Sequence, residues 1–156
     1  MEGGFMPARS KKYFVAAIIA RRRSDGTLEF IIIRSIWDGD GKLRMKFPGG
    51  MLEAIDDENS ILIALRREIR AEVGLYIKPR VRPSLLHSYE TKNEEEDIVR
   101  TFYLVWAGDC EGVLHKRGHR DGDTWMKRPE WKILEEIDTE LHTTHRPVLQ
   151  KLRRIT

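Results

Sequence analysis

Two glutamates four residues apart are the side chains of this sequence best suited to chemistry. Glu68 and Glu72 lie in segment 60–73, which contains good helix formers and no glycine or proline. Four-residue spacing places both carboxylates on one face of a helix, about one turn apart. Carboxylate oxygens are ligands that Mg²⁺ or Mn²⁺ prefers. The spacing is also compatible with two solvated side chains near Arg67 and Arg70, so spacing alone leaves both interpretations open.

Two glycines and three basic residues precede this predicted helix. Gly49 and Gly50 would let the backbone approach the helix carboxylates without a clash from a Cβ atom. Arg34, Arg44 and Lys46 flank the segment that enters the glycine pair. As charged hydrogen-bond donors they are candidates for binding the phosphates of a substrate, and surface solubility is the alternative role.

Residues 67–75, with the sequence REIRAEVGL, resemble the end of the Nudix box, whose pattern is G-x5-E-x7-R-E-U-x-E-E-x-G-U with U aliphatic. Residues 47–50, Phe-Pro-Gly-Gly, resemble the usual entry to that box. The resemblance extends over about residues 12–154. It implies a Nudix-like α/β/α sandwich with a mixed sheet, and a metal-dependent pyrophosphohydrolase that cleaves a nucleoside diphosphate linked to another moiety, of nucleotide or nucleotide-sugar type.

The resemblance also assigns roles to particular side chains. Glu68 and Glu72 would bind Mg²⁺ or Mn²⁺, and the bound ions would neutralise diphosphate oxygens and activate a water. Arg67 would pair with a neighbouring carboxylate and fix the geometry of loop and helix. A general base in this family often comes from a later loop, and here the acidic run at residues 94–97 is a candidate, with a solvated hairpin tip as the alternative.

The sequence departs from the pattern in three places. The loop after the glycine pair is three residues longer, Asn59 stands where a glutamate is expected before the helix, and Ala71 replaces one glutamate of the Glu-Glu pair. Asp56, Asp57 or Glu58 are candidates to replace the carboxylate missing at Ala71. The alternative function is therefore a catalytically weakened Nudix-fold module that binds a nucleotide-like ligand for sensing or regulation.

The elements that must position these residues follow from apolar runs and breakers. We expect strands at residues 13–20, 28–33, 83–91, 98–107 and 130–134, and helices at 60–73 and 144–154. Ser60 is the expected N-cap of the first helix, and Gly74 is the expected stop. Residues 35–46 indicate a loop and a short strand, and residues 108–129 a long loop. This order predicts a mixed α/β domain with a helix on each face of the sheet.

Composition sets the remaining expectations. The chain has 156 residues, a net charge of +3 and a single cysteine, which favours one domain in a reducing, cytoplasmic compartment. Residues 1–11 are expected to form a flexible tail and residues 12–156 the domain. The sequence contains no run of about 18 apolar residues, so we expect no membrane partner. The expected partner is a small nucleotide-like substrate.

Two partner interpretations rest on local features. The small net charge does not favour nucleic-acid binding. The basic segment 115–128 nevertheless leaves RNA binding as a third, weaker interpretation. Three consecutive apolar residues at positions 61–63 exceed what one core-facing stripe needs. They indicate an extra packing contact or a homodimer interface.

Overall fold

The computed structural model describes residues 10–52 and 57–156, and its centre is the long strand β1 (Ser10–Arg22). β1 pairs in parallel with β7 (Glu96–Trp106), and antiparallel with β2 (Leu28–Trp37) and β4 (Gly49–Leu52). Alternate side chains of β1 enter two different buried cores, one on each face of the sheet. A strand buried on both faces needs apolar residues without alternation, which is why the run is continuous.

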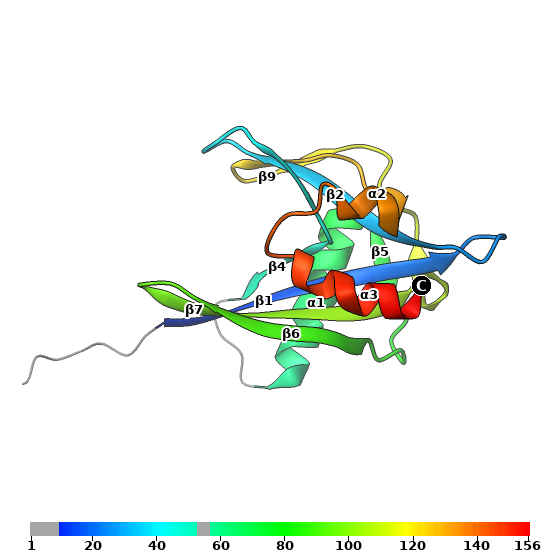
Figure 1. The fold of residues 1–156 in the computed structure, drawn as a ribbon, viewed down its shortest axis with the longest axis horizontal. Helices are drawn as coiled ribbons and strands as arrows, with labels where there is room; N and C mark the ends of the chain where they lie inside the picture. The colour runs from blue at the N-terminus through cyan, green and yellow to red at the C-terminus, as the bar shows by residue number, and fades with distance from the viewer. Residues whose placement is uncertain (1–9, 53–56) are drawn as a thin grey trace, which may run out of the picture.

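The two halves of the sheet diverge from the end where β1 meets β2. β1 pairs with β2 only through Ala20–Arg22, whereas its first half pairs with β4 through Tyr13–Ala16. The far half of β2 pairs with β3 (Leu43–Lys46) and β10 (Thr124–Met126). The ribbon that contains β2 and β9 (His119–Asp121) therefore separates from the layer of β1, β7 and β6 (Ser84–Lys92), as Figure 1 shows.

Short elements complete the fold and connect the main strands. These are β5 (Leu75–Ile77), η1 (Ala107–Asp109), β8 (Cys110–Gly112), β11 (Glu130–Ile133), α2 (Leu134–Asp138) and η2 (Arg146–Val148). β5 pairs with β8 in a separate two-stranded sheet, and β11 pairs with β2.

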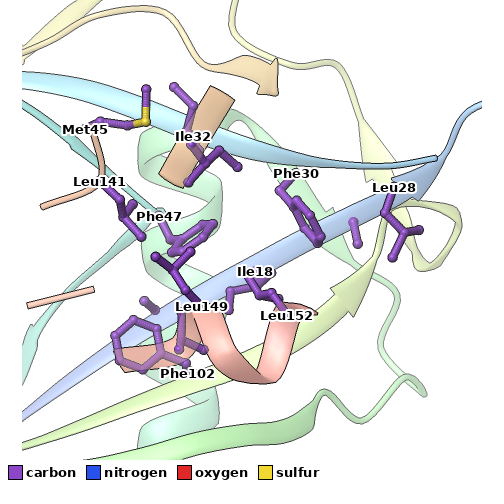
Figure 2. Close-up of a cluster of buried hydrophobic side chains, with 14 of the residues drawn as sticks. Ile18, Leu28, Phe30, Ile32, Met45, Phe47, Phe102, Leu141, Leu149 and Leu152 are labelled. Atoms are coloured by element: carbon purple, nitrogen blue, oxygen red, sulfur yellow. The ribbon is translucent and has the colours of Figure 1, made fainter. Parts of the chain in front are cut away.

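Each face of the sheet is covered by a helix. Leu65 and Ile69 of α1 (Glu58–Val73) are fully buried in the core on one face. Leu149 and Leu152 of α3 (Leu149–Ile155) belong to the core on the other face, together with Phe47 (Figure 2). The expected mixed α/β sandwich is therefore confirmed.

The first helix ends where the sequence predicts and begins two residues earlier. Gly74 adopts φ +85°, a left-handed conformation, and its N–H donates to the carbonyls of Ile69 and Arg70. The predicted N-cap, Ser60, is wrong. Asp57 caps the helix instead, and its carboxylate accepts from the backbone N–H of Ser60 at 3.1 Å.

The predicted long loop at residues 108–129 is wrong in part. It contains η1 and three strands of three residues each, β8, β9 and β10. Such short strands give no periodic signal, and they are fixed by pairing with β5 and β2 rather than by their own sequence. Residues 35–37, predicted as loop, extend β2 for the same reason.

The hairpin of β6 and β7 confirms the predicted strands at 83–91 and 98–107, with a shorter tip. Glu96 and Asp97 belong to β7, and Glu96 pairs with Lys12 at 2.9 Å. Glu96 lies opposite Ser10, five residues along β1 from the residue opposite Gly50, a separation of about 16 Å along the strand. The structure does not bring the acidic run to the helix carboxylates.

The termini and surface bear on three further expectations. Residues 1–9 of the expected tail lie outside the described residues, and β1 already includes residues 10 and 11. No helix among the described residues has the length and apolarity needed to cross a membrane. Of the apolar triplet, Ile63 is 66% exposed whereas Ile61 and Leu62 pack against the core, so the homodimer interface stays a prediction.

A buried histidine ties the loop before α3 to the segment between β3 and β4. His145 is 3% exposed, and its Nδ1 accepts from the backbone N–H of Phe47 at 3.2 Å. The rings of Phe14 and Phe102 meet its edge at centroid distances of 5.3 and 5.4 Å. Burial, with the nearby charge of Lys46, holds the pKa of His145 well below 6.5. The imidazole is therefore neutral in the folded chain.

This neutral histidine makes stability depend on pH in a defined direction. The unfolded chain protonates His145 below about pH 6.5 while the folded chain does not, so its contribution is complete above that pH and declines as pH falls. We expect the unfolding free energy of the natural chain to fall more steeply than that of His145→Gln, by roughly 1 kcal/mol per pH unit. Urea unfolding between pH 5 and 8 measures this difference, and parallel slopes would contradict it.

Candidate active site

Glu72 is a carboxylate buried between α1 and β4. It is 5% exposed, its Oε2 accepts from the backbone N–H of Gly49 at 3.3 Å, and its Oε1 lies 3.5 Å from Nζ of Lys46. Burial raises the pKa of Glu72 to about 7; Lys46 opposes the rise and the charge of Glu68 adds to it. The charge of Lys46 and the hydrogen bond from Gly49 therefore offset only part of the cost of burying the negative charge of Glu72.

Glu68 lies one turn earlier on the same face and contacts the same strand. A Cβ atom added to Gly50 would come within 2.6 Å of the carboxyl carbon of Glu68. Nη2 of Arg67 lies 3.8 Å from Oε1 of Glu68. Burial raises the pKa of Glu68 as well, while Arg67 lowers it. The helix geometry expected from the sequence is thus realised, with both carboxylates directed at the glycine pair.

The two glycines serve different purposes. At Gly50 a side chain would displace the carboxylate of Glu68, in agreement with the expectation from the sequence. At Gly49 a Cβ atom would lie 2.2 Å from the carbonyl oxygen of Val15 in β1, so the close approach there is to the neighbouring strand and not to the helix. The contact of Gly49 with the helix is the hydrogen bond from its N–H to Glu72.

Asp121, at the end of β9, is a carboxylate of this region that the sequence interpretation missed. Its negative charge contributes to the raised pKa of Glu68. From the sequence, Asp121 falls in an Asp-Gly-Asp segment that indicates only a turn. Asp121 pairs with Thr124, and Thr124 pairs with Trp37 of β2, so β9 continues the ribbon of β2 and its last residue lies close enough to Glu68 for its charge to act there. No local signal could have revealed this pairing.

The structure brings one of the three candidate phosphate-binding cations to the carboxylates. Lys46 lies beside Glu72. Arg34 instead pairs with Glu130 at 3.1 Å and with Glu140 at 3.0 Å. Arg44 pairs with Asp40 near the tip of the β2–β3 hairpin. Arg34 and Arg44 are therefore committed to other acids, and their role in phosphate binding stays a prediction.

Of the three candidates for replacing the carboxylate missing at Ala71, the two that the structure describes have other partners. Asp57 caps α1, and Glu58 pairs with Arg82 at 3.0 Å. Asp56 lies outside the described residues. Within residues 10–52 and 57–156, no group of three or more histidine, cysteine, aspartate or glutamate side chains is arranged to hold a metal ion.

The two helix carboxylates nevertheless suit a hard divalent cation. Mg²⁺ commonly binds proteins through one or two carboxylates and completes its shell with waters and substrate phosphates. Glu68 and Glu72 provide such a pair, and their incompletely compensated charge favours a cation. The donor set therefore fits Mg²⁺ or Mn²⁺, with the remaining ligands supplied by solvent and substrate.

A comparison with known families identifies the arrangement. The NUDIX domain model matches residues 12–152. The chain belongs to the Nudix family. Because the family model spans nearly the whole chain, the resemblance seen in residues 67–75 is confirmed for the whole domain. The family comprises hydrolases that act on phosphoric anhydrides.

Solved Nudix structures show the same fold. The E. coli ORF135 protein has a TM-score of 0.68 and 20% identity, covering 97% of this chain and 95% of its own. The MutT Nudix hydrolase from Burkholderia pseudomallei has a TM-score of 0.65 and 21% identity, covering 91% and 98%. The Nudix domain of Shewanella oneidensis NrtR, solved with ADP ribose, has a TM-score of 0.58 and 16% identity, and the match covers 97% of this chain and 91% of the NrtR domain. None of the curated proteins is significantly similar to this chain.

The unequal roles of the two glycines in this Nudix site give a matched pair of substitutions. We expect Gly49→Ala to cost about 3 kcal/mol or more of unfolding free energy, because backbone atoms of β1 cannot move away. We expect Gly50→Ala to fold and to lose about 10–100-fold in metal affinity, because only the flexible carboxylate of Glu68 must shift. Thermal unfolding and Mn²⁺ titration measure the two effects. Equal destabilisation of both variants would contradict the assignment.

Proposed function

We propose that this Nudix protein is a metal-dependent pyrophosphohydrolase that cleaves a nucleoside diphosphate linked to another moiety. The observation that carries the proposal is the juxtaposition of Glu68 and Glu72 over the glycine pair, with their charge incompletely compensated. The ADP ribose bound by the similarly folded NrtR domain supports a substrate of nucleotide type. ADP ribose is itself a nucleoside diphosphate joined to a second sugar.

In this mechanism Glu68 and Glu72 would hold the Mg²⁺ or Mn²⁺. When bound, the ion supplies positive charge to the diphosphate oxygens and lowers the pKa of a water. Lys46 balances part of the charge of Glu72 and can donate a hydrogen bond to a phosphate oxygen that reaches the site. Arg67 acts as a positioning residue through Glu68, and the absence of a side chain at Gly50 leaves the carboxylate of Glu68 in place.

A second candidate function follows from Ala71 and from the lack of a third carboxylate ligand among the described residues. With two ligands the protein would bind a metal and a nucleotide weakly and turn it over slowly. The site at Glu68 and Glu72 would then serve to sense a nucleotide-like ligand. Both functions require nucleotide binding, and turnover distinguishes them, so one experiment separates them.

Hydrolysis of a panel of nucleoside di- and triphosphate derivatives with Mg²⁺ or Mn²⁺ tests the proposal. We expect metal-dependent turnover by the natural chain and a loss of about 100-fold or more in Glu68→Gln and Glu72→Gln. Glu135→Gln, on an exposed position of α2, is the matched control and should retain full turnover. We further expect Glu72→Gln to melt no lower than the natural chain, since it removes a desolvated charge and can keep an acceptor for Gly49.

Turnover that survives in Glu72→Gln would refute the proposed metal site. Absence of turnover by the natural chain on every compound, combined with a nucleotide that raises its melting temperature, would refute the hydrolase and favour the sensing module.

A further inference from the structure

An open cleft of about 530 Å³ lies beside the last turn of α1, next to the carboxylate pair. It is lined by Ala71 and by residues 113–119, the segment that joins β8 to β9. Two hydrogen bonds fix this segment on the helix: the N–H of His115 donates to the carbonyl of Val73 at 2.9 Å, and Nε2 of His115 lies 3.2 Å from the carbonyl oxygen of Ala71. The cleft is thus attached to the same helix turn that carries Glu72.

The charges of this cleft are of one sign. Lys116 and Arg117 line it with exposed side chains, and the imidazoles of His115 and His119 lie edge to face with centroids 5.7 Å apart. None of the described residues that line the cleft is acidic. Lysine and arginine side chains that line a concave surface favour an anion, and arginine matches phosphate geometry through paired donors.

The cleft borders the acidic site at Ala71, which lines the cleft and follows Glu68 by three residues on α1. His119 lines the cleft, and Asp121, two residues later on the same strand, acts on Glu68 through its charge. Residues three apart on a helix have Cβ atoms about 5–6 Å apart, which sets the separation of Glu68 from the cleft wall at Ala71. A ligand whose diphosphate lay over Glu68 and Glu72 would therefore extend a further phosphate into the cleft within the length of a short polyphosphate chain.

Ala71 acquires a role in this arrangement. The Nudix pattern places a glutamate at this position, and a carboxylate there would enter the wall of the cleft and cancel part of its positive charge. Alanine keeps that wall open and uncharged. The departure at Ala71 is thus accounted for by an anion site as well as by the loss of a metal ligand.

We propose that this cleft binds a phosphate beyond the scissile linkage, so that the substrate is a nucleoside polyphosphate rather than a nucleotide joined to an uncharged sugar. The inference rests on the proposed hydrolase function for its substrate. The cleft itself is a phosphate-binding site defined by Lys116, Arg117 and the two imidazoles.

Calorimetric titration of the full chain with inorganic tripolyphosphate, without added metal, tests the site independently of catalysis. We expect binding by the natural chain and at least about tenfold weaker binding by the double variant Lys116→Ala/Arg117→Ala. The double variant Arg80→Ala/Arg154→Ala removes the same charge from exposed positions outside the cleft and should bind within about twofold of the natural chain. Circular dichroism confirms that each variant is folded.

Ala71→Glu is a second test of the cleft, because residue 71 is exposed and a larger side chain fits there without disturbing the core. We expect tripolyphosphate binding to weaken by at least about tenfold. Unchanged tripolyphosphate affinity in Ala71→Glu, equal losses in the two double variants, or no binding by the natural chain would each overturn the proposal. Tripolyphosphate binding that depends on the cleft, without turnover of any panel compound, would refute the hydrolase while the phosphate site stands.

Discussion

The arrangement of this domain depends on a four-residue strand, β4, held between β1 on one side and α1 on the other. At Gly49 the strand approaches β1 so closely that no Cβ atom fits, and at Gly50 the same is true against Glu68 of the helix. Two adjacent positions without side chains are what allow a helix carboxylate and a sheet backbone to touch. Phe47 and Pro48 lead directly into this strand from β3, so the same segment connects the half of the sheet that contains β2 with the half that contains β1.

The β3–β4 segment separates two electrostatic environments. On the α1 face, the charge of Glu68 raises the pKa of Glu72, the charge of Asp121 raises that of Glu68, and Lys46 is the cation that contacts Glu72. On the α3 face, the charged groups that act on His145 are cations, Lys46 and Arg100 among them, and His145 stays neutral. Lys46 thus contributes to both sides. Between these two faces, the excess of negative charge lies on the first, which is where the proposed metal cation would bind.

Helix α1 and the buried strands could be predicted because their signals are local. Gly74 stops the helix through its own backbone conformation, and the apolar run of β1 reflects burial on both faces. The pairing of Glu68 with Glu72 on one face follows from helix geometry alone. The family pattern adds the identity of the chemistry, since spacing by itself would also describe two solvated glutamates.

The residues that escaped prediction are those whose placement depends on distant partners. Arg34 forms ion pairs with Glu130 and Glu140, about a hundred positions later in the chain, and the sequence around Arg34 gives no indication of these partners. Asp121 reaches the site only because β9 and β10 continue the ribbon of β2, in a pairing that three-residue strands cannot encode by pattern. Side-chain direction in such strands is a property of register, and register here is set by tertiary contact.

The last turn of α1 carries Glu72 of the proposed metal site and also contacts the glycine that ends the helix and the segment that forms the basic cleft. A Cβ atom at Gly74 would lie 2.7 Å from the carbonyl oxygen of Val113 and 2.9 Å from Nδ1 of His115, so the glycine that ends the helix also admits the segment that forms the cleft. The carbonyls of Ala71 and Val73 bond His115 there. The segment that carries the positive charge of Lys116 and Arg117 is consequently tied to the helix that carries the negative charge of Glu68. A cation with an extended polyanion satisfies both, whereas a cation alone or an anion alone would leave one of them uncompensated.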